Sequence, residues 1–146
     1  IIQEKFNNGY NEAISLALRD KRIADSDAIV ILPGDIPLIT TEEIENFIND
    51  APKNGIRIAP DRDREGTNAL LLAPPTLIKT QFGKLSYSRH LELAEKCCSN
   101  VEVIDSDGLA FDIDSPEDLK DFCGTASSTK SYEFLKRNGI AASLLG

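Results

Sequence analysis

The sequence of 146 residues contains no methionine, one histidine and three cysteines. Cys97 and Cys98 are adjacent, the number of cysteines is odd, and no C-x-x-C pair is present. A structural zinc site or a disulfide framework is therefore disfavoured, and ordinary reduced thiols of a cytoplasmic protein are expected. Long apolar runs are also absent, because no stretch approaches the roughly 20 residues that a membrane helix needs. We therefore expect no membrane partner.

Positive charge is scarce as well. The 16 lysines and arginines are outnumbered by 24 acidic residues, which gives a formal net charge of -8. A nucleic acid needs a basic face on its protein partner, so this balance argues against nucleic-acid binding. A nucleoside triphosphate remains compatible with an acidic protein, because Mg²⁺ can bridge carboxylates to phosphate oxygens.

Several catalytic signatures are missing. Neither G-x-x-x-x-G-K-[ST] nor G-x-G-x-x-G occurs, so the sequence predicts no P-loop and no Rossmann dinucleotide site. His90 is the only histidine and has no acid placed beside it, so acyl transfer through a nucleophile triad has little support. We interpret His90 as a structural residue rather than a general base.

Patterns of strands and helices alternate along the chain. Apolar runs bounded by turn residues predict strands over residues 28–32, 55–61, 66–75, 101–107 and 109–114. Apolar periodicity and capping residues predict helices over residues 7–22, 40–50, 86–98, 115–123 and 129–138. The alternation predicts an α/β domain with a mainly parallel sheet over residues 1–124, followed by a helical tail over residues 125–146.

Acidic residues recur where predicted strands end. Those positions are Asp35, Asp61, Asp63, Asp112 and Asp114. In open α/β sheets, ligands bind beyond the carboxyl ends of the strands, so these side chains are expected to share one rim. A rim of carboxylates suits Mg²⁺, which in turn recruits phosphate. The alternative is that each carboxylate only shapes a turn or caps a helix.

The stretch "FGKLSYSRH" has a different character. Gly83 and Ser86 place a flexible turn and a hydroxyl group just before a predicted helix. Free backbone N–H groups at such a helix start can bind a carboxylate or a phosphate. An ordinary N-cap by Ser86 is the equally weighted alternative.

The order of these motifs resembles a known family. The segments "GYNEAI", "LPGDIPLIT", "APDR", "GTNALLL", "FGKLSYSRH" and "DIDSPEDL" follow the order and approximate spacing of the 2-phospho-L-lactate guanylyltransferase family. That family serves biosynthesis of coenzyme F420. The resemblance runs from about Gly9 to about Asp121, and "GTNALLL" followed by "FG…S…RH" is its most specific part.

The resemblance implies a three-layer αβα nucleotidyltransferase-like domain of GT-A type. Family members begin with a strand and a basic loop that wraps the triphosphate, and no such segment precedes the helix expected over residues 7–22. We therefore expect this chain to be the C-terminal part of that domain, lacking the N-terminal strands. A homodimer is the expected assembly.

The resemblance also implies a reaction and its residues. The phosphate of 2-phospho-L-lactate, or of phosphoenolpyruvate, would attack the α-phosphate of GTP and release pyrophosphate. By position, Asp35 and Asp112 match catalytic Mg²⁺ ligands, and Asp114 is a further metal ligand. The implied acceptor pocket contains Thr67, Asn68, Gly83, Ser86 and Arg89. The implied nucleotide-binding residues are Gly9, Asn11 and Pro33.

Two other interpretations remain open. One is a nucleotidyltransferase of the same fold that uses CTP, UTP or a sugar phosphate. The other is a non-catalytic module that binds phosphometabolites or packs against a partner protein.

Overall fold

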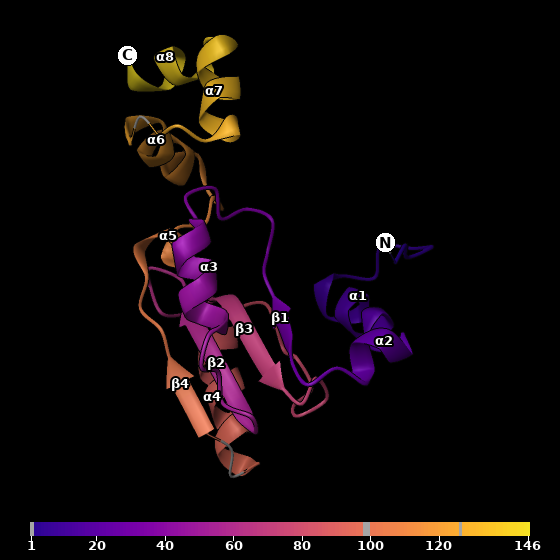
Figure 1. Cartoon of the computed structure of the whole chain (residues 1–146). Coiled ribbons are helices and arrows are strands. Elements are labelled where there is room, and N and C mark those ends of the chain that lie inside the picture. The colour runs from indigo at the N-terminus through magenta and orange to yellow at the C-terminus, as the bar shows by residue number, and fades with distance from the viewer. Residues whose placement is uncertain (1, 98–99, 126) are drawn as a thin grey trace.

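The computed structural model describes residues 2–97, 100–125 and 127–146. Within these residues one sheet contains the strands β1 (Ile29–Ile31), β2 (Gly55–Pro60), β3 (Thr67–Ala73) and β4 (Asn100–Val103). The helices are α1 (Tyr10–Ala17), α2 (Lys21–Ala24), α3 (Thr41–Ile48), α4 (Ser86–Lys96), α5 (Asp107–Ala110), α6 (Pro116–Gly124), α7 (Lys130–Arg137) and α8 (Ile140–Leu145). Figure 1 shows α3 in front of the sheet and α4 behind it.

The strands lie in the order β1-β3-β2-β4. β3 pairs antiparallel with β1 and with β2, whereas β4 pairs parallel with β2. β1, β2 and β4 therefore run in one direction and β3 runs against them. A hairpin of residues 61–66 joins β2 to β3, and it is too short for the crossover of a dozen or more residues that parallel neighbours need. The α/β prediction is confirmed, but the sheet is mixed rather than mainly parallel, because β3 forms two antiparallel pairs and β2 with β4 forms the one parallel pair of the described sheet.

Apolar side chains pack on both faces of the sheet and create three layers. Successive residues of a strand point to opposite faces. Leu70 of β3 accordingly joins the cluster that contains Ile14 of α1 and Ala94 of α4. Leu71 joins the other cluster, which contains Phe47 of α3. β3 is buried along its whole length because helices cover both of its faces.

The strand predicted over residues 109–114 is wrong, so Asp112 does not follow a strand. The helix α5 occupies the start of this segment, and the Ser106 hydroxyl caps it by accepting a backbone N–H. The Glu43 carboxylate of α3 holds the turn, because it accepts hydrogen bonds from the Ser106 hydroxyl and, at 2.8 Å, from the Gly108 N–H. Local capping interactions therefore outweigh the short apolar pattern.

In two places the structure has two helices where the sequence predicted one. The helix expected over residues 7–22 divides into α1 and α2, and Asp20 begins α2 by accepting the Arg22 N–H at 3.0 Å. The helix expected near the C-terminus is followed by α8, with Gly139 at a positive φ of 71° between the two. Cys98, which was expected to be an ordinary thiol, lies outside the described residues.

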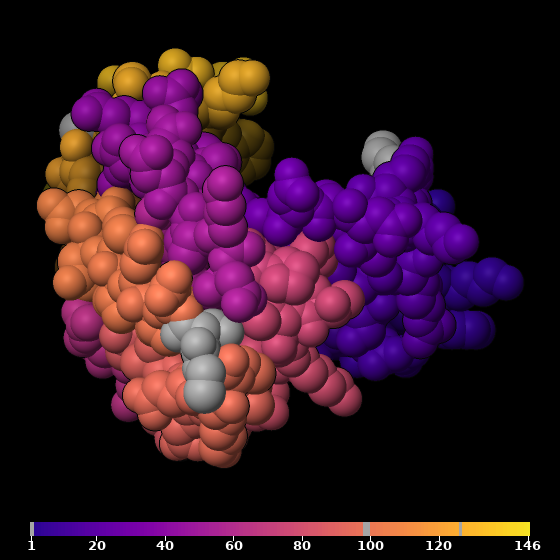
Figure 2. All heavy atoms as spheres, turned by 60° about the horizontal axis from the view of Figure 1, so that its bottom comes forward, coloured from indigo at the N-terminus to yellow at the C-terminus, as the bar shows by residue number. Residues whose placement is uncertain are grey.

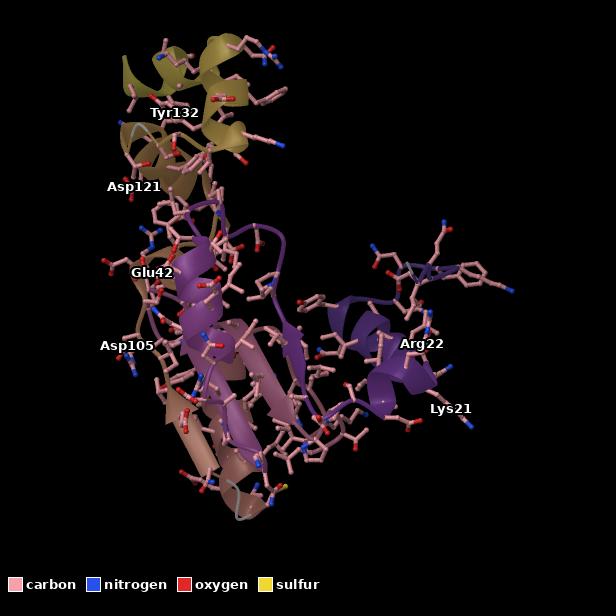
Figure 3. The ribbon with its side chains drawn as sticks, in the orientation of Figure 1. Lys21, Arg22, Glu42, Asp105, Asp121 and Tyr132 are labelled. Atoms are coloured by element: carbon pink, nitrogen blue, oxygen red, sulfur yellow. The ribbon has the colours of Figure 1, made fainter. Side chains whose placement is uncertain are left out.

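The C-terminal helices pack on α6 rather than on the sheet. The rings of Phe122 and Tyr132 meet edge to face with centroids 6.2 Å apart, and Tyr132 lies between α6 and α7 (Figure 3). Figure 2 shows the N-terminal segment and the C-terminal helices projecting on either side of a hollow. Within the described part of the chain, no helix combines the length and the apolar character that crossing a membrane requires.

A buried guanidinium ties α3 to the sheet. Arg57 of β2 is 6% exposed, and its Nη2 lies 2.6 Å from the Glu102 carboxylate of β4. Its Nη1 donates to the carbonyl oxygens of Asn46, Phe47 and Asn49, and its Nη2 donates to that of Asp50. The last carbonyls of a helix lack partners within the helix and carry partial negative charge. Arg57 therefore satisfies the end of α3 while Glu102 balances its charge.

We predict that Arg57→Met lowers the free energy of unfolding by about 3 kcal/mol, because it leaves the carbonyls of α3 without donors. Urea unfolding of the variant and the parent measures the difference. Arg22→Met is the matched control, since Arg22 lies on the outer side of α2 and is 85% exposed (Figure 3). A stability loss no larger than that of the control would contradict this role of Arg57.

Candidate active site

A cleft of about 380 Å³ opens at the edge of the sheet where β1 and β2 end and β3 begins. Its lining residues are Tyr10, Pro33, Asp35, Asp61, Glu65, Gly66, Thr67, Asn68, Phe82, Gly83, Lys84, Leu85, Ser86, Asp112 and Asp114. The antiparallel course of β3 matters here, because it puts the first residues of β3 beside the last residues of β1 and β2. Carboxylates and hydroxyl groups from distant parts of the sequence thus share one cavity.

A β-bulge at the start of β3 brings two consecutive side chains into the cleft. Pro60 pairs with Thr67 and Ala59 pairs with Ala69, so Asn68 is the extra residue. Side chains normally alternate between faces, yet Thr67 and Asn68 both line the cleft. Both are buried, and Asn68 Nδ2 has no hydrogen-bond partner within the described residues. Bulges recur beside active sites because they redirect side chains in this way.

A buried chain of polar groups lies behind Thr67. Ser86 Oγ donates a hydrogen bond to Thr67 Oγ1 at 3.2 Å, and His90 Nδ1 lies 3.1 Å from the same oxygen. The Gln81 N–H donates to His90 Nε2 at 2.9 Å. Burial lowers the pKa of His90 to about 4, so its imidazole is neutral at pH 7.

The loop over residues 81–85 is held between α1 and α4. The Asn11 side chain binds both polar groups of Phe82: Nδ2 donates to the carbonyl at 2.9 Å and Oδ1 accepts the N–H at 2.8 Å. The Phe82 ring lies edge to face between Tyr10 and His90, at centroid distances of 4.8 and 4.9 Å. Asn11 therefore positions this loop, and the nucleotide contact expected of it stays a prediction.

The start of α4 differs from an ordinary capped helix. Leu85, with a positive φ of 57°, stands at the N-cap position and Ser86 lies inside the helix. The Ser86 N–H donates to the Gly83 carbonyl at 3.0 Å, while its hydroxyl turns to Thr67. The alternative of Ser86 as a simple N-cap is wrong. Gly83 has a φ of 117°, a conformation that glycine adopts without strain.

Carboxylates gather on the same cleft. The pKa of Asp112 is raised, chiefly because burial disfavours its charged form, and repulsion from Asp114 and Asp61 adds to this. The nearby Asn68 amide acts in the opposite direction by favouring the ionised form, although its Nδ2 does not reach hydrogen-bond geometry. Burial raises the pKa of the Tyr10 phenol, and the charge of Asp35 adds to this effect. The site thus concentrates negative charge that a cation would stabilise.

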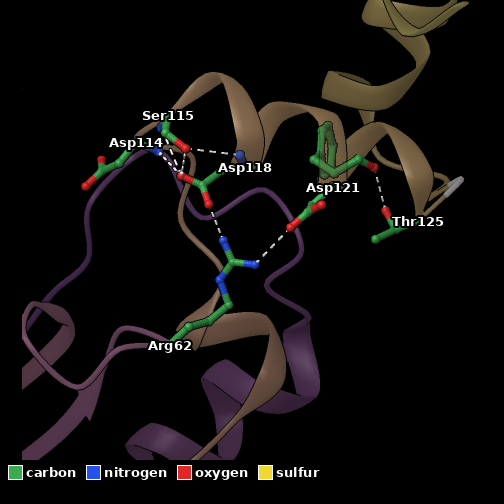
Figure 4. A network of polar contacts seen from close by, with 7 residues as sticks. Arg62, Asp114, Ser115, Asp118, Asp121 and Thr125 are labelled. Atoms are coloured by element: carbon green, nitrogen blue, oxygen red, sulfur yellow. Dashed lines mark hydrogen bonds and ion pairs between the residues drawn. The ribbon is translucent and has the colours of Figure 1, made fainter. Parts of the chain in front are cut away.

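Backbone contacts set the positions of these acids. The Ile113 N–H donates to the Asp35 carbonyl at 3.1 Å, which ties the two acidic segments together. The Asp118 carboxylate accepts the Asp114 N–H at 3.2 Å and forms the capping box of α6 with Ser115 (Figure 4). The Asp114 carboxylate points away from this network. Asp114 therefore contributes its backbone N–H to the cap, and its carboxylate can face the cleft that Asp114 lines.

Asp61 serves the hairpin as well as the cleft. Its carboxylate accepts the Glu65 N–H at 2.9 Å and the Gly66 N–H at 2.7 Å. These bonds close the connection between β2 and β3. The turn-shaping alternative therefore holds for Asp61. Asp63 is exposed and does not line the cleft.

The side chains of the cleft determine which metal ions it suits. Within the described residues, no three side chains of His, Cys, Asp or Glu are arranged to hold one. Mg²⁺ does not need such a cage, because it commonly binds through one or two carboxylates, several waters and substrate phosphates. Asp35, Asp112 and Asp114 supply the oxygen ligands that this mode requires. The residues present therefore fit Mg²⁺ and do not fit a metal that needs three or four protein ligands.

The structure brings together most, though not all, of the residues expected in the site. Those that line the cleft are Pro33, Asp35, Thr67, Asn68, Gly83, Ser86, Asp112 and Asp114. Arg89 does not line it and is exposed on α4. Gly9 and Asn11 also lie outside the lining, although Tyr10 between them belongs to it. Gly9 instead precedes α1 at its N-cap with a φ of 91°.

Sequence reasoning missed Tyr10 and Lys84 as lining residues. Both lie inside motifs that were recognised, "GYNEAI" and "FGKLSYSRH". Lys84 could have been found from its place between Gly83 and Ser86, since an amine there can neutralise an anion. No pattern in the sequence distinguishes Tyr10 from other surface aromatics.

We predict that Asp112→Asn raises the melting temperature at pH 7, measured with a chelator present. The folded-state pKa of Asp112 is raised, so ionisation costs more in the folded state than in the unfolded state. The stability advantage of the variant should vanish below about pH 4, where the unfolded carboxyl is protonated, and grow to a plateau above the folded pKa. A variant that melts below the parent at pH 7 would contradict this reading.

Comparison with known proteins identifies the chain's relatives. A family model described as "Guanylyl transferase CofC like" matches residues 1–144. The chain is 38% identical over 118 residues to a phosphoenolpyruvate guanylyltransferase of Sphaerobacter thermophilus, covering 81% of this chain and 57% of the relative. It is 35% identical over 139 residues to a 2-phospho-L-lactate guanylyltransferase of a Methanocaldococcus species, covering 95% and 59% respectively. The chain thus spans less than two thirds of the length of these relatives.

A solved structure supports the fold. A nucleotide-diphospho-sugar transferase from Desulfovibrio desulfuricans G20 superposes with a TM-score of 0.71 over 97% of this chain and 64% of that one. The identity is 19%, so the likeness concerns architecture alone. The family match over nearly the whole chain agrees with the order of the motifs along the sequence, and residues of these motifs line the cleft. The chain belongs to the CofC-like guanylyl transferase family.

Proposed function

We propose that this chain forms the acceptor and metal side of an enzyme that transfers GMP from GTP to 2-phospho-L-lactate or phosphoenolpyruvate, as a step of coenzyme F420 biosynthesis. One observation carries the proposal: a single cleft is lined both by aspartate carboxylates and by the hydroxyl groups of Thr67 and Ser86. The names of the relatives supply the two acceptor acids. The proposal includes Mg²⁺ as cofactor and, from the family resemblance, a homodimer in the cytoplasm.

The reaction needs alignment more than covalent help. An oxygen of the acceptor phosphate would attack the α-phosphorus of GTP, and the bond to the β-phosphate would break with its electrons leaving on pyrophosphate. The acceptor phosphate is already ionised, so no general base is required. Holding both reactants in line removes most of the entropic barrier.

The residues divide this work between them. Thr67 would present its hydroxyl group and Lys84 its amine to the anionic groups of the acceptor, while Ser86 supports the Thr67 hydroxyl. Asp35 and Asp112, with Asp114, would hold Mg²⁺. Bound there, the ion would neutralise charge on the reacting phosphates. The buried Asn68 amide would support Asp112 from the β3 side.

Turnover tests the proposal directly. The protein is incubated with Mg²⁺, each nucleoside triphosphate in turn, and either acceptor acid, and pyrophosphate release is followed. We expect release with GTP. Release with CTP or UTP alone would favour another nucleotidyltransferase of this fold, and acid binding without release from any triphosphate would favour a non-catalytic module.

Variants then assign the acidic residues. Asp35→Asn should lower turnover at least about 100-fold, because it removes a metal ligand, while leaving the melting temperature nearly unchanged since Asp35 is exposed. Asp63→Asn is the matched control, because Asp63 is an exposed acid outside the cleft. Full activity of Asp35→Asn would overturn the metal assignment.

Binding of Mg²⁺ has a readout that needs no turnover. The ion should raise the melting temperature of the parent protein and of Asp63→Asn, because a ligand that binds the folded state stabilises it. The shift should disappear in Asp35→Asn and Asp112→Asn. An equal shift in all four proteins would place Mg²⁺ elsewhere.

A further inference from the structure

His90 is the only histidine of the chain, and the proposed reaction gives it no task. Its side chain is completely buried, yet both ring nitrogens have polar neighbours. A packing residue at this place would need no such pair of partners. The hydrogen-bond directions show what the ring does.

The backbone fixes the position of the ring proton. The Gln81 N–H can only donate, and it lies 2.9 Å from His90 Nε2, so Nε2 must be the unprotonated acceptor nitrogen. A neutral imidazole then carries its hydrogen on Nδ1. That hydrogen is donated to Thr67 Oγ1, 3.1 Å away. Burial in apolar surroundings, including the edge of Phe82, keeps the ring neutral at pH 7.

The ring proton in turn fixes the Thr67 hydroxyl. A hydroxyl oxygen can accept two hydrogen bonds and donate one. Thr67 Oγ1 accepts one from His90 Nδ1 and one from Ser86 Oγ, so both acceptor positions are filled. Its own hydrogen has to go to a third group. Because Thr67 lines the cleft, that hydrogen is directed to a molecule in the cleft, which is water in the free protein and an acceptor atom of the ligand when one is bound.

We propose that His90 is a positioning residue that holds the Thr67 hydroxyl as a hydrogen-bond donor toward an anionic oxygen of the bound acid. The order of donors runs from the Gln81 N–H through His90 to Thr67, and from Ser86 to Thr67. The identity of the acid as a 2-phospho carboxylic acid rests on the proposed function. The polarity of the chain rests on the hydrogen bonds alone.

This arrangement favours acceptor oxygens over donor groups in the ligand. A carboxylate or phosphate oxygen completes the last hydrogen bond of a buried network. A ligand with an amide N–H or an ammonium group at the same place would leave two donors facing each other, which is costly in a buried site. His90 would therefore set specificity without touching the ligand.

The first experiment observes the tautomer. Nitrogen chemical shifts of the imidazole in ¹⁵N-labelled protein are free of overlap, because there is one histidine. We expect a protonated Nδ1 and an unprotonated Nε2 at pH 7. Protonation on Nε2, or an averaged mixture of tautomers, would overturn the proposal. This measurement needs neither turnover nor ligand, so its outcome is separate from that of the proposed function.

The second experiment uses two substitutions that each reproduce one of the two hydrogen-bonding functions of the imidazole. In His90→Asn the amide Nδ2 can stand where Nδ1 stands and still donate to Thr67. In His90→Gln the amide oxygen can stand where Nε2 stands and still accept the Gln81 N–H, but the donor to Thr67 is lost. Binding of phosphoenolpyruvate and of 2-phospho-L-lactate is measured by calorimetry for both variants, with melting temperatures recorded in parallel.

We expect His90→Gln to weaken binding roughly 10-fold to 100-fold, the effect of losing one oriented hydrogen bond to a charged group. His90→Asn should stay close to the parent. Equal losses in both variants would mean that His90 only supports packing, and would overturn the proposal. Absence of binding of either acid to the parent protein would overturn the assignment of the ligand.

A double variant tests whether His90 acts through Thr67. Thr67→Val removes the hydroxyl and keeps the shape of the side chain. Adding His90→Gln to Thr67→Val should then cause no further loss of affinity. Additive losses would overturn the proposal. Intact acid binding without GMP transfer would refute the proposed function while leaving the role of His90 standing.

Discussion

The central position of strand β3 constrains the rest of the structure. Each of its residues is buried, strands pair with both of its edges, and helices cover both of its faces. A strand in that position can carry polar side chains only at an end, because polar groups in its middle would lack partners. Its N-terminal end is where the bulge lies, and Thr67 and Asn68 face the cleft from there. The cleft therefore depends on where this one strand begins.

The surroundings of that end follow from the same constraint. The buried Thr67 hydroxyl needs hydrogen-bond partners, and α4 provides them through Ser86 and His90. His90 in turn binds the loop over residues 81–85, which Asn11 of α1 holds from the other side. Elements that are distant in sequence are thus joined around one hydroxyl. The acidic segments reach the cleft separately, through the backbone contact between Asp35 and Ile113.

Negative charge is the second property on which the site depends. Burial raises the pKa of Asp112, so its ionised carboxylate lowers the stability of the folded protein when no cation is bound. Sites that bind cations and phosphates commonly carry such strain, because the ligand relieves it. Asp61 accepts two backbone hydrogen bonds from its own hairpin. Asp35, Asp112 and the side chain of Asp114 remain for a ligand.

The sequence by itself determined the alternation of strands and helices, the capping boxes of α3 and α6, and the motifs that carry the family resemblance. These signals are local, since a capping residue or an apolar run acts on its immediate neighbours. It also contained a clue that the parallel-sheet interpretation overlooked, because residues 61–66 are too few for a parallel crossover. Only the tertiary structure decided that α5 replaces a strand, that Asn11 holds a loop, that Arg89 stays outside the cleft, and that His90 joins the network of Thr67. Each of these depends on contacts between residues far apart in the chain, and no local pattern records such contacts.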